Sequence, residues 1–62
     1  MTPKGKAFSL FAEYASRLND GRIAKQCALI AVDEILKVVS FYNDTQAEIT
    51  YWQEVKQEIE KL

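Results

Sequence analysis

Residues 23–39 constrain the fold most, because this stretch is too apolar for an ordinary surface helix. Eleven of its seventeen residues are aliphatic or alanine, Cys27 adds a further apolar side chain, and neither glycine nor proline interrupts it. A surface helix keeps a polar face over about half of its circumference. A chain of 62 residues buries only about 60% of the surface that its unfolded form exposes. We therefore expect part of the cover to come from a second copy of the chain.

The chain can stabilise a small core only by packing and self-association. Its 62 residues make one domain, near the lower limit for independent folding. One cysteine excludes an intrachain disulfide, and without histidine no zinc or haem site is expected. Cys27 lies among alanines, which favours a small core residue over a reactive thiol. A single cysteine without a disulfide partner is typical of a protein in the reducing cytosol.

Charge and hydropathy limit the location and the partners. Residues 1–6 lack the apolar core of a signal peptide, and no run reaches the roughly 18–20 apolar residues of a membrane span. We expect a soluble cytoplasmic protein. A net charge of −1 argues against nucleic-acid or membrane-surface binding. The charge is nevertheless divided, since residues 1–26 are mainly basic and residues 27–62 mainly acidic. The basic part suits an anion or an acidic face of another subunit.

Three helices are predicted, at about residues 3–18, 21–40 and 46–62. Thr2 followed by Pro3 indicates an N-cap and a first helical residue. Residues 19–21 (Asn, Asp, Gly) form a first break. In a second break at residues 43–45, Thr45 with Glu48 matches a capping box. The predicted fold class is all-α, a chain of two or three helices with an antiparallel helical hairpin, assembled as a homo-oligomer.

Two charges interrupt the apolar surface of the second predicted helix. Glu34 and Lys25 both project among aliphatic side chains, where an unpaired charge costs several kcal/mol. We expect Glu34 to pair with a basic residue of a neighbouring subunit, with Lys25 as one candidate. The subunit interface is predicted on the small-residue side of this helix, at Ala24, Ala28, Leu29, Ala31, Val32 and Ile35.

The residue inventory favours binding over catalysis. There is no histidine, glycine-rich phosphate loop, nucleophile elbow or metal cluster, so neither enzymatic activity nor a cofactor is expected. A nucleotide needs aromatic faces for its base and cations for its phosphates. The candidate ligand-binding residues are Arg17, Arg22, Lys25, Tyr42, Tyr51 and Trp52. In the alternative interpretation Trp52 belongs to the core seam of the third helix, and the arginines are solvated.

Two segments carry a family resemblance, residues 24–36 (AKQCALIAVDEIL) and 51–62 (YWQEVKQEIEKL). With the opening TPK, they resemble a family of very small proteins encoded by bacteriophages, notably those of gut Bacteroidota. In size and helical character the chain is similar to phage sponge proteins. This resemblance implies a counter-defence protein that sequesters a nucleotide-derived immune signal, such as a cyclic ADP-ribose, between subunits in the host cytosol.

Two other functions remain open. The first is a protein-binding inhibitor of a host factor, which would use Leu29 and the acidic residues Glu54, Glu58 and Glu60. It accounts for the acidity of the C-terminal part of the chain. The second is a structural or assembly accessory without a small-molecule ligand.

Overall fold

The structure, a computed structural model, describes residues 2–42 and 46–62. Within these residues the chain forms three helices and no strand: α1 (Pro3–Leu18), α2 (Gly21–Tyr42) and α3 (Gln46–Lys61). The predicted all-α class is confirmed. α2 continues to Tyr42, beyond the expected end near residue 40. The capping box expected at Thr45 lies outside the described residues.

Side chains of the first break end one helix and begin the next. Asn19 takes the left-handed conformation, with φ 55°, and its N–H donates to the carbonyl oxygen of Ala15 at 2.9 Å. The carboxylate of Asp20 then accepts hydrogen bonds from the backbone N–H groups of Arg22 (3.0 Å) and Ile23 (3.2 Å). These bonds satisfy backbone groups that a helix end leaves without partners. The residue that ends α1, Asn19, and the residue that caps the start of α2, Asp20, are therefore adjacent in the sequence.

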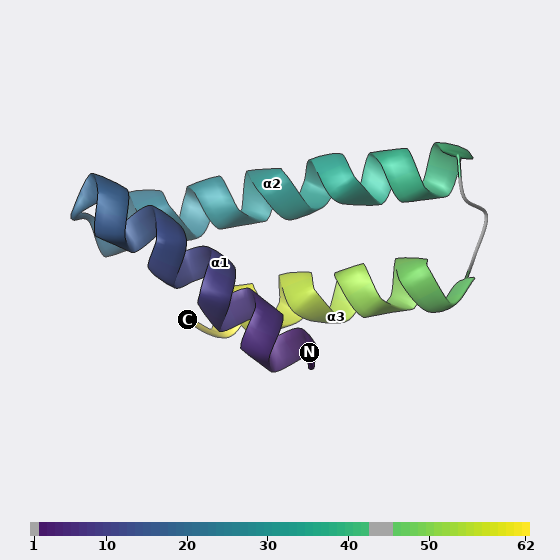
Figure 1. Ribbon diagram of the computed structural model, residues 1–62, viewed down its shortest axis with the longest axis horizontal. Coiled ribbons are helices and arrows are strands. Elements are labelled where there is room, and N and C mark those ends of the chain that lie inside the picture. Colours follow the sequence, from purple (N-terminus) through teal and green to yellow (C-terminus); the bar gives the residue numbers. More distant parts are fainter. Residues whose placement is uncertain (1, 43–45) are drawn as a thin grey trace.

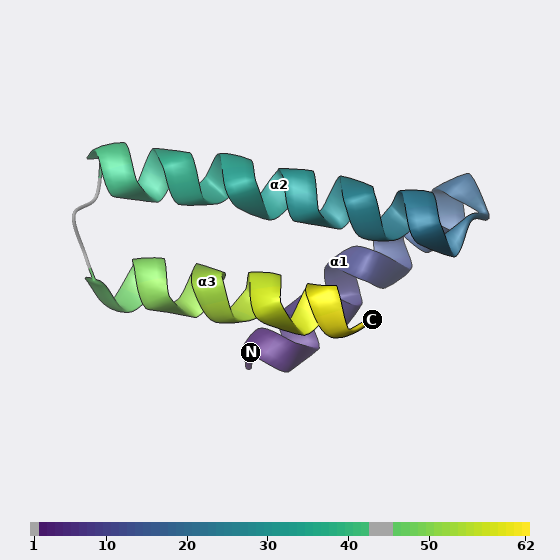
Figure 2. The same cartoon turned by 180° about the vertical axis from the view of Figure 1, so that it is seen from behind.

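The three helices pack as one pair with a third helix laid across it. α2 and α3 lie side by side along the long axis, and α1 crosses one side of them obliquely (Figures 1 and 2). α1 covers the end where α2 begins and α3 finishes, and the other end of the pair extends beyond it (Figure 1). Polar contacts join the pair: Lys25 Nζ donates to the Glu60 carbonyl oxygen at 2.8 Å, and Lys56 Nζ pairs with Asp33 Oδ1 at 3.0 Å.

The core between the helices is built from small residues. Its buried members are Ala7, Ala24, Ala28, Val32, Val55 and Ile59. Larger, partly buried side chains pack against these residues: Leu10, Tyr14, Leu29, Leu36, Tyr51 and Trp52. The accessible surface is 4431 Å², against about 4,100 Å² expected for a folded monomer of this mass. The radius of gyration, 11.5 Å, likewise exceeds the about 10.6 Å typical of this length.

Candidate functional site

α2 presents an apolar surface on the side that faces away from the core. We call this surface the outer face of α2; it is formed by Ile23, Cys27, Ile30, Glu34, Val38 and Phe41. These residues follow one another at steps of three and four, so at about 100° per residue they share one side of the helix. Ala24, Ala28 and Val32, which are buried, lie on the opposite side. α2 therefore has two apolar sides, and the chain itself covers one.

Most of the outer face is exposed, and Cys27 is half-buried. Ile30, near its middle, is 62% exposed, and Phe41, at its C-terminal end, is 80% exposed. Large contiguous apolar surfaces of this kind are uncommon on soluble monomers and usually mark a contact with another molecule. A shallow hollow of about 260 Å³ lies at the C-terminal end, lined by Lys37, Val38, Phe41 and Tyr42.

Glu34 and Lys25, the two charges that interrupt the apolar surface of α2, both make polar contacts within the chain. Glu34 Oε1 pairs with Lys37 Nζ of the same helix at 3.3 Å, and both side chains are exposed. Lys25 reaches α3, where it bonds the carbonyl oxygen of Glu60. Glu34 and Lys25 therefore do not meet in this chain. The long lysine stem carries its charge away from the core side of α2, which the sequence pattern alone does not reveal.

The predicted subunit interface coincides largely with the core of a single chain. Ala24, Ala28 and Val32 are fully buried against the chain's own helices, so they have no surface left for a second copy. Leu29 packs against the same core, whereas Ala31 and Ile35 are half-buried. The correction has a simple physical reason. Alanines let helices approach closely, and the chain uses that side of α2 for its own α1 and α3.

Several predicted ligand-binding residues have partners within the chain. Arg17 pairs with Glu13 of the preceding turn at 2.8 Å, and Lys25 is held by Glu60. Tyr51 and Trp52 form an edge-to-face contact with ring centroids 5.2 Å apart. Both rings pack against the core, and the ammonium group of Lys6 lies 6.0 Å from the centroid of Trp52. Trp52 thus occupies the place that the alternative interpretation gave it.

The other two predicted residues, Arg22 and Tyr42, lie at opposite ends of α2. Twenty residues separate them, which corresponds to about 30 Å along a helix. Both flank the outer face, and the ring of Tyr42 makes an edge contact with that of Phe41 at 4.8 Å between centroids. Phe41 is therefore an aromatic neighbour that the sequence analysis did not select. One chain does not bring the predicted cations and aromatic rings together.

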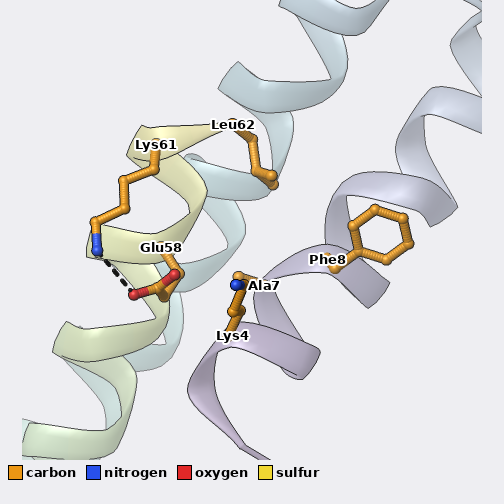
Figure 3. A pocket seen from close by; sticks show the side chains of 6 residues that line it. All are labelled: Lys4, Ala7, Phe8, Glu58, Lys61 and Leu62. Carbon is orange, nitrogen blue, oxygen red and sulfur yellow. Dashed lines mark hydrogen bonds and ion pairs between the residues drawn. The ribbon is translucent and has the colours of Figure 1, made fainter.

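A second hollow lies between the start of α1 and the end of α3 (Figure 3). It has a volume of about 430 Å³, and its lining residues are Lys4, Ala7, Phe8, Glu58, Lys61 and Leu62. Lys61 Nζ pairs with Glu58 Oε2 at 3.0 Å, while the ring of Phe8 points away from that pair (Figure 3). None of the predicted ligand-binding residues lines this hollow. Its lining residues come from opposite ends of the sequence, so no local motif predicted this hollow.

The described part of the chain holds no group of three or more His, Cys, Asp or Glu residues placed to bind a metal ion. Among the same residues, no helix is both long and apolar enough to cross a membrane. No buried side-chain nitrogen or oxygen atom in residues 2–42 and 46–62 lacks a hydrogen-bond partner. The structural feature that stands out is therefore the outer face of α2.

Comparison of the chain with protein-family models, with curated proteins and with solved structures finds no match. The resemblance to the phage family consequently rests on residues 24–36, residues 51–62 and the opening TPK.

Proposed function

We propose that the protein is a phage counter-defence protein that acts as a homo-oligomer in the host cytoplasm. It binds a nucleotide-derived immune signal, such as a cyclic ADP-ribose, between subunits and sequesters it without turnover. The structural unit is an antiparallel hairpin of α2 and α3 with α1 laid across it. The contacts of Lys25 with Glu60 and of Asp33 with Lys56 support this unit, because residue numbers rise along α2 as they fall along α3.

One observation carries the proposal: the residues suited to the ligand are divided between the two ends of an uncovered apolar helix face. Arg22 lies at one end, and Tyr42 with Phe41 lies at the other. About 30 Å of helix separates them, so a single chain cannot place both on one nucleotide. A second copy that covers the face can supply the missing half of the site.

The chemistry of the two ends suits a nucleotide. The guanidinium of Arg22 has no acidic partner among the described residues, whereas Arg17 is paired with Glu13. A free guanidinium can bind phosphate oxygens in a bidentate manner. Phe41 and Tyr42 present exposed rings on which a base can stack. The affinity would then come from stacking and from charge-assisted hydrogen bonds.

Calorimetry tests this proposal directly. Folded protein is titrated with cyclic ADP-ribose isomers and with cyclic dinucleotides, and thermal unfolding is followed with and without each compound. We expect saturable binding of at least one compound, a raised melting temperature and recovery of the unchanged ligand. Folded protein that binds none of these compounds would remove the nucleotide proposal.

A matched pair of arginine variants makes the test specific. Arg22→Gln is expected to weaken ligand binding at least about tenfold, since a charge-assisted contact contributes about 1.5–3 kcal/mol. Arg17→Gln removes the same charge from a side chain already held by Glu13, so binding should change less than about threefold. Equal losses in the two variants would indicate non-specific attraction of the anion to a basic surface.

A host-protein inhibitor is the second candidate, because the exposed outer face of α2 also suits a protein partner. Glu54 and Glu60 are exposed on α3, whereas Glu58 is paired with Lys61 and Leu29 packs against the core. Stoichiometric capture of one host protein, lost when Glu54 and Glu60 are changed to lysine, would favour this function. If neither assay gives a partner, the third function, a structural accessory, is favoured.

A further inference from the structure

We propose that a second copy of the chain covers the outer face of α2, with the two α2 helices antiparallel and Ile23 of each copy opposite Phe41 of the other. The ligand-binding part of this inference rests on the proposed function, whereas the pairing does not. Each end of the pair would assemble one site from Arg22 of one copy and the ring of Phe41 of the other.

The occupant is a second copy, because the face is long and carries exposed apolar side chains near both of its ends. Ile23 and Phe41 lie 18 residues apart, about five helical turns, so both point to the same side. Ile30 and Val38 continue the apolar surface between them. A two-fold axis near the middle of the face brings the same surface from each copy into contact, as in most symmetric dimers.

The charges on the face select the antiparallel orientation. In a parallel pair each Glu34 would lie level with Glu34 of the second copy, and each Lys37 level with Lys37, so like charges would oppose each other. In the antiparallel register, Glu34 lies opposite Ile30 and remains paired with Lys37 of its own helix. Antiparallel helices also place opposite ends of their dipoles side by side.

The helix ends give a second, independent reason for this register. The last turn of α2 contains no basic residue, although a cation there would be favourable. Arg22, at the start of α2, has no acidic partner among the described residues. With Ile23 opposite Phe41, the Arg22 of one copy comes level with the last turn of the other. Each copy then supplies the charge that its partner's helix lacks.

The same juxtaposition defines the ligand sites. The hollow of about 260 Å³ at the end of the outer face is lined by Lys37, Val38, Phe41 and Tyr42, and Arg22 of the second copy approaches that end. The two-fold axis produces two such sites. We therefore expect one ligand molecule per chain rather than one per pair.

A pair of charge substitutions tests the surface. Ile30→Glu places a carboxylate in the middle of the outer face, opposite Glu34 of the second copy, and should raise the dissociation constant of the pair at least about tenfold. Gln53→Glu adds the same charge at an exposed position of α3 and should leave association unchanged. Sedimentation equilibrium measures both, and circular dichroism verifies that each variant is helical. Wild-type protein that stays monomeric at millimolar concentration would overturn the inference.

Mixed disulfide cross-linking tests the orientation without depending on either charge variant. Two single-cysteine chains are prepared in a Cys27→Ser background, one with Ile23→Cys and one with Phe41→Cys, and are oxidised separately and together. The antiparallel register predicts cross-links between the two different chains and few within either alone. Efficient cross-linking of each chain to itself would indicate a parallel pair and would contradict the inference.

These results separate the pairing from the ligand. Cross-linked pairs of the expected register that bind no nucleotide would leave the pairing intact and overturn the proposed function. Nucleotide binding that persists unchanged in Ile30→Glu monomers would leave the pairing intact and overturn the shared site, because it would show a site complete within one chain.

Discussion

Lys25 Nζ donates a hydrogen bond to the backbone carbonyl oxygen of Glu60, 2.8 Å away, and so joins the start of α2 to the last turn of α3. The carbonyl groups of a last turn have no partner within their own helix. A positive charge at this place also interacts favourably with the helix dipole. The sequence analysis assigned Lys25 to a phosphate or to Glu34. The structure instead gives it a role in holding two helices together.

The first prediction concerns this contact. Lys25→Met keeps the aliphatic stem but removes the donor and the charge, and it should lower the free energy of unfolding by about 1 kcal/mol. Lys37→Met is the control, because the Lys37–Glu34 pair lies within one exposed helix and should contribute less than about 0.5 kcal/mol. Urea denaturation measures both values. Equal losses would show that the Lys25 contact adds nothing beyond surface charge.

The second prediction distinguishes the two apolar sides of α2. Ala28 is fully buried, so Ala28→Glu forces a charge into the core at a cost of several kcal/mol. The whole stability expected for a chain of this length is only about 3–9 kcal/mol, and we expect the variant to be largely unfolded. Ile30→Glu, two residues further on, should stay helical. Circular dichroism of both variants provides the test.

The opposite outcome would be equally informative. A folded Ala28→Glu variant together with an unfolded Ile30→Glu variant would mean that α2 turns its other side toward α1 and α3. The outer face would then be the core, and Ala24, Ala28 and Val32 would become available to a second copy, as the sequence analysis expected.

The third prediction concerns the start of α2. Asp20→Ala removes the carboxylate that accepts from the N–H groups of Arg22 and Ile23, and it should destabilise the chain by about 1 kcal/mol. Asp20→Asn keeps a side-chain oxygen and should retain most of that stability. Thermal unfolding of the two variants gives the comparison. If Asn and Ala destabilise the chain equally, the charge rather than the cap is responsible.

Local signals in the sequence were sufficient for the helices. Thr2, Asn19 and Asp20 act on backbone groups within three or four residues of themselves, so their effects can be inferred from the sequence. The all-α class followed from these signals and from helical spacing. The extension of α2 to Tyr42 was not predicted from the sequence. Phe41 and Tyr42 are exposed, so no pattern of buried side chains marks this last part of the helix.

The choice between two apolar sides could not be made from the sequence. Ala28 and Ile30 both lie in an apolar stretch, and hydrophobicity favours burial of Ile30. In the structure Ala28 is nevertheless fully buried and Ile30 is 62% exposed. Distant contacts such as Lys25 with Glu60 depend on how the helices dock, so they were missed for the same reason.

The fourth prediction concerns the ion pair between Lys56 and Asp33, which joins the middle of α2 to α3 at 3.0 Å. The hydrogen bond to Asp33, together with the charges of Asp33 and Glu60, raises the pKa of Lys56 above its usual 10.5. The folded chain therefore holds this proton more tightly than the unfolded chain does. From neutral pH up to 10.5 the pair stabilises the fold fully, and this stabilisation is lost as the pH rises through the raised pKa.

A double-mutant cycle isolates this effect from the titration of other groups at alkaline pH. Lys56→Met should destabilise the chain at neutral pH, and its difference from the wild type should shrink above pH 10.5. In an Asp33→Asn background the same substitution should show a much smaller pH dependence, because the partner that raises the pKa is gone. Urea denaturation of the four chains at neutral and alkaline pH measures the coupling. A coupling that stays constant across this range would mean that Lys56 and Asp33 interact through packing of the lysine stem rather than through charge.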